Sequence, residues 1–281
     1  MKAKRVLLII MIVVILAVGA VFAYCQIIRN RSDIEQVPPE VTIPEPEIVQ
    51  PPVIDVSEPP VEEPTDNYEQ HENDYEIEYV DLTPFLELIA ALADAREQID
   101  NDDIVGFISI PNTNVNYPFV QTVDNSFYLY HDVHRNSSSA GAVFLDYLST
   151  PDFTDPNTII YGHNMRSGII FHNLRYYVFG AQSQEFLEDH PNIYIVTDDY
   201  VLVFEIFSVF TTHIDFYYIQ VYFAEGEFEE LVNELNHRSY HDTGITATGE
   251  DNLLLLSTCT NIHRDTRIVI ASRLAQRLEI H

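Results

Sequence analysis

The sequence has few basic residues. There are 14 Lys and Arg against 44 Asp and Glu, and the formal net charge is -30. This deficit argues against nucleic-acid binding, because phosphate groups are neutralised by basic side chains that displace counterions. Acidity on this scale keeps a protein soluble and repels anionic surfaces, but it identifies no fold. With 46% hydrophobic residues, a chain of 281 residues can still build one sizeable core.

Cysteine is also scarce. Only Cys25 and Cys259 occur, whereas a small secreted domain that depends on disulfides carries several pairs. Cys25 lies at the edge of an apolar stretch, so we expect Cys259 to be a free thiol. No group of His, Cys and Asp has the spacing of a metal site, and no glycine-rich phosphate loop occurs. We therefore expect neither a metal nor a cofactor.

The N-terminal region predicts a membrane anchor. Three basic residues lie among residues 1–5, and the following run, residues 6–23, is uncharged. A helix of this length spans about 27 Å, close to the thickness of the bilayer hydrocarbon core. The basic residues place the N-terminus in the cytoplasm and the remainder of the chain outside. A cleaved signal peptide is the alternative, but the run is longer than its usual apolar segment. A lipoprotein is disfavoured by the bulky Tyr24 before Cys25.

An acidic, proline-rich segment follows. Residues 32–81 contain no Lys or Arg, 16 Asp and Glu, and nine of the 15 prolines. Such a composition favours an extended chain and cannot bury enough apolar area to offset the cost of ordering. We interpret it as a disordered stalk rather than a ligand for a proline-recognition module. The predicted organisation is a cytoplasmic tail at 1–5, a transmembrane signal anchor at 6–25, the stalk at 26–81 and a catalytic domain at 82–281.

From Leu82 onward, short apolar runs separated by turn residues dominate the sequence. Two segments follow a helical period, 85–99 and 227–238. Many strands with few helices indicate an all-β fold with peripheral helices, either a barrel or a sandwich, and not a parallel α/β fold. Eight runs rich in β-branched and aromatic residues predict the strands: 104–110, 115–121, 140–147, 157–162, 193–198, 200–210, 252–259 and 266–274.

Cys259 stands at the end of an unbroken apolar run. Residues 253–256 are all leucine, as expected for a strand buried on both faces. The polar residues 257–261 follow, so the thiol lies where a strand delivers a side chain to a rim. A lone cysteine is nevertheless most often a small buried hydrophobe.

Two other residues are expected near this rim. The last predicted strand begins seven residues after Cys259, and a short connection makes the two strands antiparallel neighbours. Arg267 then begins its strand beside the end of the Cys259 strand, although Arg264 in the connecting loop is a rival and a solvated strand-edge charge is a common alternative. Residues 158–161 read as a strand, and His163 follows it in the turn Gly162-His163-Asn164. Four other histidines are its nearest rivals: His131, His134, His172 and His263.

These three side chains form a chemically coherent set. A thiolate attacks a peptide carbonyl, and a nearby imidazole assists thiolate formation and protonates the departing amine. A fixed guanidinium donates to the developing oxyanion or holds the substrate backbone.

The sequence resembles the sortase family, and class B most closely. The resemblance depends on YGHN around His163, LSTC ending at Cys259, and Arg267 at the start of the last strand. The helix before the LSTC strand, the N-terminal helix ahead of GFISIP, and the DNSFYL and AGAVFLDY segments are also similar to class B. The likeness runs from about Leu82 to the C-terminus.

The resemblance implies a closed eight-stranded β-barrel and an envelope transpeptidase. Such an enzyme cleaves the C-terminal sorting signal of surface proteins after Thr and transfers the new carboxyl to an amine of peptidoglycan or its lipid-linked precursor. It also implies that His163, Cys259 and Arg267 are catalytic. Four residues are implied to bind the sorting peptide, although Leu129 suits a core position equally well: Asn125, Leu129, Ser257 and Thr258. A hydrolytic envelope cysteine peptidase and a non-catalytic surface module on a stalk remain as alternatives.

Overall fold

The computed structural model describes residues 81–280, in which eight strands close into a barrel in the order β1-β2-β3-β4-β7-β8-β6-β5. This confirms the predicted closed barrel, and each predicted strand run overlaps one strand, although β5, β6 and β8 extend beyond their predicted runs. The predicted tail and anchor, and all but the last residue of the predicted stalk, lie outside the described residues. The strands are β1 (Ile104–Ser109), β2 (Asn116–Val120), β3 (Val143–Leu145), β4 (Asn157–Tyr161), β5 (Asn192–Val196), β6 (Tyr200–His213), β7 (Leu253–Cys259) and β8 (Thr266–Glu279).

The β7 strand is buried on both faces, as its apolar run predicted. It lies between a parallel neighbour, β4, and an antiparallel neighbour, β8. Leu254 and Leu256 belong to the cluster that fills the barrel. Leu253 and Leu255 point the other way and pack in a second cluster with apolar residues of α4. Successive side chains of a strand alternate between faces, so this strand needs apolar residues at every position until it reaches the rim.

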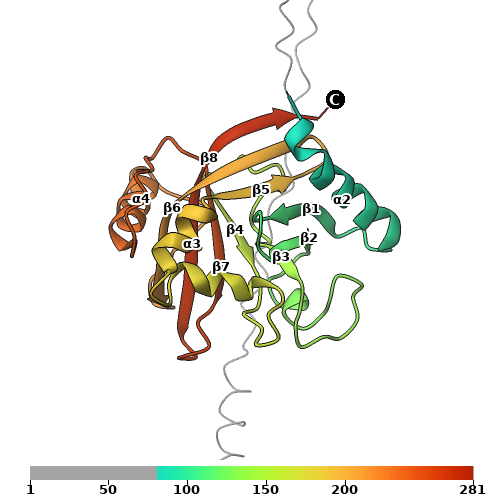
Figure 1. The fold of residues 1–281 in the computed structure, drawn as a ribbon, viewed down its shortest axis with the longest axis horizontal. Coiled ribbons are helices and arrows are strands. Elements are labelled where there is room, and N and C mark those ends of the chain that lie inside the picture. The colour runs from blue at the N-terminus through green and yellow to red at the C-terminus, as the bar shows by residue number, and fades with distance from the viewer. Residues whose placement is uncertain (1–80, 281) are drawn as a thin grey trace, which may run out of the picture. The chain divides into compact units, whose positions relative to one another are not determined.

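Two of the helices match the helical patterns of the sequence. The helices α2 (Leu86–Gln98) and α4 (Glu227–Arg238) lie on opposite sides of the barrel (Figure 1). The 3-10 segment η1 (Thr83–Phe85) lies at the start of the predicted helical segment 85–99. The sequence did not predict α3 (Ser183–Asp189) or the 3-10 segments η2 (Phe127–Leu129) and η3 (Phe171–Tyr177). Each is too short to show a clear helical period, and such short helices depend on tertiary packing. None of the helices in residues 81–280 has the length and apolar character that a membrane crossing requires.

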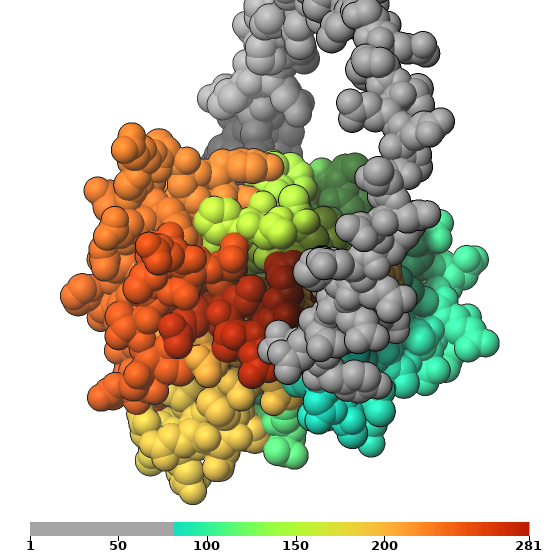
Figure 2. All heavy atoms as spheres, turned by 90° about the horizontal axis from the view of Figure 1, so that it is seen from above, coloured from blue at the N-terminus to red at the C-terminus, as the bar shows by residue number. Residues whose placement is uncertain are grey.

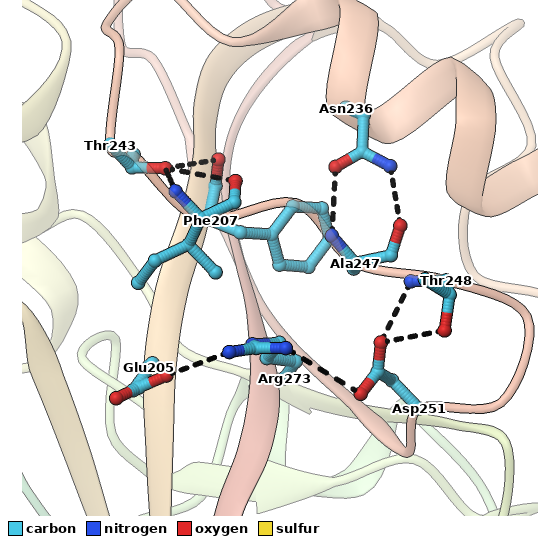
Figure 3. A network of polar contacts seen from close by, with 9 residues as sticks. Glu205, Phe207, Asn236, Thr243, Ala247, Thr248, Asp251 and Arg273 are labelled. Carbon is cyan, nitrogen blue, oxygen red and sulfur yellow. Dashed lines mark hydrogen bonds and ion pairs between the residues drawn. The ribbon is translucent and has the colours of Figure 1, made fainter.

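Polar contacts fix α4 and the segment after it to the barrel wall (Figure 3). Arg273 of β8 forms two ion pairs. Its Nη2 lies 3.3 Å from Oε2 of Glu205 on β6, and its Nη1 lies 4.0 Å from Oδ1 of Asp251, just before β7. Asn236 of α4 donates to the carbonyl of Ala247 at 2.8 Å and accepts from its amide at 3.1 Å. Seen from above, the segment that carries α4 (orange) lies on the opposite side of the domain from the segment that carries α2 (blue-green) (Figure 2). The inserted helix is therefore a fixed part of the domain.

Candidate active site

Three of the predicted site residues belong to strand ends that meet at one rim of the barrel. β4 and β7 are parallel and paired along their lengths, so their carboxyl ends lie together. β8 runs antiparallel to β7, with Arg267 opposite Cys259. His163 follows the last residue of β4 by two positions. The predicted antiparallel pairing of the last two strands is thereby confirmed.

A pocket of about 320 Å³ opens at this rim. All seven predicted site residues line it: Asn125, Leu129, His163, Ser257, Thr258, Cys259 and Arg267. Much of the remaining wall comes from the segment between β6 and α4, which the sequence analysis did not assign to the site: Ile214, Phe216, Tyr217, Tyr218 and Ile219. The aromatic run FYYI directly after a strand is the signal that could have indicated it.

Cys259 is a free thiol and is partly exposed. It is the last residue of β7, and both of its neighbours, Thr258 and Thr260, are buried. The side chain therefore sits at the boundary between the packed barrel and the pocket. A cysteine that served only as a core hydrophobe would be enclosed instead.

His163 is held by the backbone of the segment that carries Leu129. Its Nε2 lies 2.9 Å from the Leu129 carbonyl oxygen. Because a carbonyl only accepts, Nε2 carries the proton, and in the neutral ring Nδ1 is left to accept one. Gly141, at φ 60°, permits this arrangement: a Cβ there would lie 2.5 Å from the Tyr128 carbonyl oxygen and 3.1 Å from Cδ2 of His163. The ring is thus fixed by packing against backbone.

Asn164 joins the His163 turn to the end of β7. Its side chain, which is buried, donates to the Cys259 carbonyl at 2.9 Å and contacts Nδ1 of His172 at 3.1 Å through its oxygen. Asn261, just after β7, donates to the Asn164 carbonyl at 2.5 Å. The turn that carries the imidazole is therefore hydrogen-bonded to the end of β7, which carries the thiol, and to the loop that follows it.

Asn125 is positioned by a buried carboxylate. Asp146 accepts a hydrogen bond from Nδ2 of Asn125 and another from the Tyr161 hydroxyl, both at 2.8 Å. The Asn125 oxygen accepts from the Tyr147 amide at 3.0 Å. Burial raises the pKa of Tyr161, and the nearby Asp146 charge adds to that increase, so the phenol stays neutral and donates. These contacts fix one wall of the pocket.

Ser257 and Tyr218, which both line the pocket, form a hydrogen bond with each other. Their hydroxyl oxygens are 2.7 Å apart, and both residues are buried. Burial raises the pKa of Tyr218, while the hydrogen bond to Ser257 and the charge of Arg267 oppose that increase. Tyr218 therefore ties the segment between β6 and α4 to β7, two residues before the thiol.

Replacing Tyr218 by Phe is expected to lower the free energy of unfolding by about 1–3 kcal/mol, because the buried Ser257 hydroxyl loses its partner. Adding Ser257→Ala to that variant should lower the free energy of unfolding only a little further, because the unpaired hydroxyl is then absent. Urea unfolding of the two single variants and the double variant measures both effects. Strictly additive losses would contradict a direct bond between the two hydroxyls.

Arg267 has a fixed guanidinium. It is partly exposed, and its Nη1 donates to the carbonyls of Arg264 at 3.1 Å and Thr266 at 3.2 Å. Within residues 81–280 it forms no ion pair with a carboxylate. Arg264, the rival position, lies in the β7–β8 loop, is exposed and does not line the pocket.

The rival histidines have other surroundings. His131 stacks on the Phe127 ring at 4.1 Å, His172 is bonded to Asn164, and His134 and His263 are exposed. In the described part of the chain, His163 alone among these histidines lines the pocket. Residues 81–280 contain no group of three or more His, Cys, Asp or Glu that could hold a metal ion.

Comparisons with known proteins show the family of this chain and agree with its fold. The family model of the sortase domain matches residues 108–275. Sortase B of Listeria monocytogenes serovar 1/2a is 36% identical over 180 residues, which cover 63% of this chain and 72% of that protein. The structure of sortase B from B. anthracis has a TM-score of 0.58 at 33% identity, over 66% of this chain and 83% of that chain. The structure of Clostridium perfringens sortase B has a TM-score of 0.59 at 26% identity, over 67% of this chain and 100% of that chain.

Proposed function

The chain belongs to the sortase family, with class B relatives, and from this premise we propose that it is a cell-envelope cysteine transpeptidase that acts through a thioacyl intermediate on Cys259. Sortases are transpeptidases of the cell envelope, and the proposal adds the residues and the substrates. The observation that carries it is the pocket at the rim, because Cys259, His163 and Arg267 line it together although they are far apart in the sequence.

In the proposed first half-reaction, Sγ of Cys259 attacks the carbonyl carbon of a Thr residue in a C-terminal sorting signal. The thiol proton passes to Nδ1 of His163, the nitrogen left open by the bond from Nε2 to the Leu129 carbonyl. The guanidinium of Arg267 donates to the oxyanion of the tetrahedral intermediate. His163 then gives its proton to the departing amine, and a thioester remains on Cys259.

In the second half-reaction, an amine nitrogen attacks the thioester carbonyl carbon. The amine proton passes through His163 to the sulfur, so a new amide forms and the free thiol returns. The proposed acceptor is an amine of peptidoglycan or of its lipid-linked precursor. Four residues that line the pocket are proposed to hold the sorting peptide during both steps: Asn125, Leu129, Ser257 and Thr258.

The remaining part of the proposal concerns placement in the envelope. Residues 6–25 are proposed to anchor the chain in the membrane with residues 1–5 in the cytoplasm. Residues 26–81 would then act as a spacer that holds the domain at 82–281 outside the cell, where surface proteins with sorting signals are its partners. The uncharged run and the acidic proline-rich composition support these assignments.

Amine trapping tests the proposal against a hydrolytic peptidase. The full-length chain is expected to cleave members of a quenched fluorescent peptide pool with Thr fixed at the cleavage position and varied neighbours. With hydroxylamine or triglycine present, mass spectrometry should find the Thr carboxyl joined to that amine. A product with only a free carboxyl, at every amine concentration tried, would indicate a hydrolase. An absence of cleavage, together with slow alkylation of Cys259, would indicate a non-catalytic module.

A further inference from the structure

Positive charge is distributed unevenly over the described residues. Residues 81–280 contain 29 Asp and Glu, nine Arg and no Lys. The longest stretch without an acidic residue in this part of the chain is 156–184, which contains β4 and the His163 turn. A second acid-free stretch, 252–264, contains β7 with Cys259 and most of the following loop. The loops that follow these two strands each contain one His and one Arg: His163 and Arg166 after β4, and His263 and Arg264 after β7.

Hydrogen bonds hold these two loops together. Asn164 donates to the Cys259 carbonyl, and Asn261 donates to the Asn164 carbonyl. Arg166 lies two residues after Asn164, so chain geometry keeps their Cα atoms within about 7 Å. The carbonyl of Arg264 accepts from the Arg267 guanidinium at 3.1 Å. Both arginines are therefore carried by backbone that is docked around Cys259.

Arg166 and Arg264 have charges that no carboxylate neutralises. Both are exposed, and neither forms an ion pair within residues 81–280. Asp265 is the one acidic residue in the β7–β8 loop, and it pairs with neither of them. Four other arginines of this part of the chain do contact carboxylates: Arg96, Arg135, Arg238 and Arg273.

We propose that Arg166 and Arg264 form an anion-binding rim, called here the arginine rim, that selects amine acceptors bearing a carboxylate or phosphate group. This inference rests on the proposed transpeptidase function and specifies its acceptor. The net negative charge of the domain repels anionic molecules, so an anionic acceptor needs local positive charge to approach Cys259. Guanidinium groups suit this task because their planar donors match carboxylate and phosphate oxygens.

Two cell-wall sources offer this chemistry. Stem peptides of peptidoglycan carry carboxylates, and a lipid-linked precursor carries phosphate. The anionic group takes no part in bond making, since the amine nitrogen alone attacks the thioester. The arginine rim should therefore affect how well the acceptor binds and leave formation of the thioacyl intermediate unchanged.

The test uses amine acceptors that differ only in charge. For carboxylate the pair is triglycine and triglycine amide, and for phosphate it is phosphoethanolamine and ethanolamine. The donor is a peptide from the pool described above that the full-length chain cleaves. With this donor, kcat/KM for the anionic amine should be about three- to tenfold higher than kcat/KM for its neutral partner. The preference should shrink in about 1 M salt, where exposed charges are screened. The pair with the larger ratio identifies the preferred anion.

Variants assign the preference to the arginine rim. In the Arg166→Gln, Arg264→Gln double variant, the ratio of kcat/KM for the anionic amine to kcat/KM for the neutral amine should fall close to one. Its rate of donor cleavage without amine should be unchanged. The corresponding Lys variants should retain part of the preference. Arg96→Gln removes the same charge from α2, which contributes no residue to the pocket, and should retain the wild-type ratio. A wild-type ratio of one, or a preference that survives in the double Gln variant, would overturn the inference. Failure of the proposed function looks different, because then either no peptide is cleaved or the Thr carboxyl is released free and neither amine of a pair is joined to it.

Discussion

The Cys259→Ala variant is expected to lose thioacyl formation and amine adducts entirely while its barrel folds like that of the wild type. Removing a proposed nucleophile costs on the order of 10⁴-fold or more in rate, because no other group near the carbonyl forms the covalent intermediate. The substitution should change the free energy of unfolding only a little. Cys259 is the last residue of β7 and is partly exposed, so the substitution removes one sulfur from the rim and no methylene group from the core.

Mass spectrometry of the full-length chain incubated with peptide measures the thioacyl adduct, and urea unfolding with near-UV circular dichroism measures the fold. The chain supplies a matched control, since Cys25→Ala removes the only other thiol and should leave turnover unchanged. Cys259→Ser, which nearly preserves shape, should also be inactive, because the hydroxyl is a far weaker nucleophile at neutral pH. Turnover by a folded Cys259→Ala protein would refute the covalent mechanism.

The barrel was predictable because its strands leave strong local patterns. The continuous leucines of 253–256 indicate burial on both faces, and the β4–β7–α4 packing is the physical reason. The longer helices α2 and α4 show a clear helical period. The seven-residue helix α3 does not, because fewer than two turns are too few to separate its apolar face from chance. The end of β8 was also missed, since its apolar run stops at Leu274 while pairing with β6 continues to Glu279.

The site was only partly predictable. Residues in the YGHN and LSTC segments stand beside strand ends, and strand ends can be located from sequence. The contribution of Tyr218 depends on a hydrogen bond across the pocket to Ser257, between segments 39 residues apart. Asn164 and Asp146 were likewise present in quoted motifs, yet their partners lie on other strands and loops. The pattern of residues within one segment does not predict hydrogen bonds between segments that are far apart in the sequence.

The choice between Arg264 and Arg267 shows how strand register separates two similar residues. The sequence places both after Cys259, and only the pairing of β7 with β8 sets Arg267 directly opposite the thiol. Arg267 also donates from one nitrogen, Nη1, to two backbone carbonyls. This anchors the guanidinium plane and leaves its other N–H groups free to donate toward the pocket.

Arg267→Lys is therefore expected to slow acylation by about 10²- to 10³-fold even though the positive charge is retained. A lysine ammonium is a compact point charge on a flexible chain, so it cannot keep one donor group on the backbone carbonyls while another is aimed at an oxyanion. Arg267→Gln should lose at least as much, because the charge is removed as well. Single-turnover rates of thioacyl formation at saturating peptide separate this effect from weaker binding.

Arg175→Lys is the matched control for this experiment, since Arg175 is exposed on η3, does not line the pocket and should tolerate the same substitution. A wild-type acylation rate in Arg267→Lys would show that a diffuse positive charge is sufficient and that the fork geometry has no role. A loss confined to KM would instead make Arg267 a residue that holds the sorting peptide. Only a loss in the acylation rate itself supports donation to the oxyanion, because that interaction is stronger in the transition state than in the bound substrate.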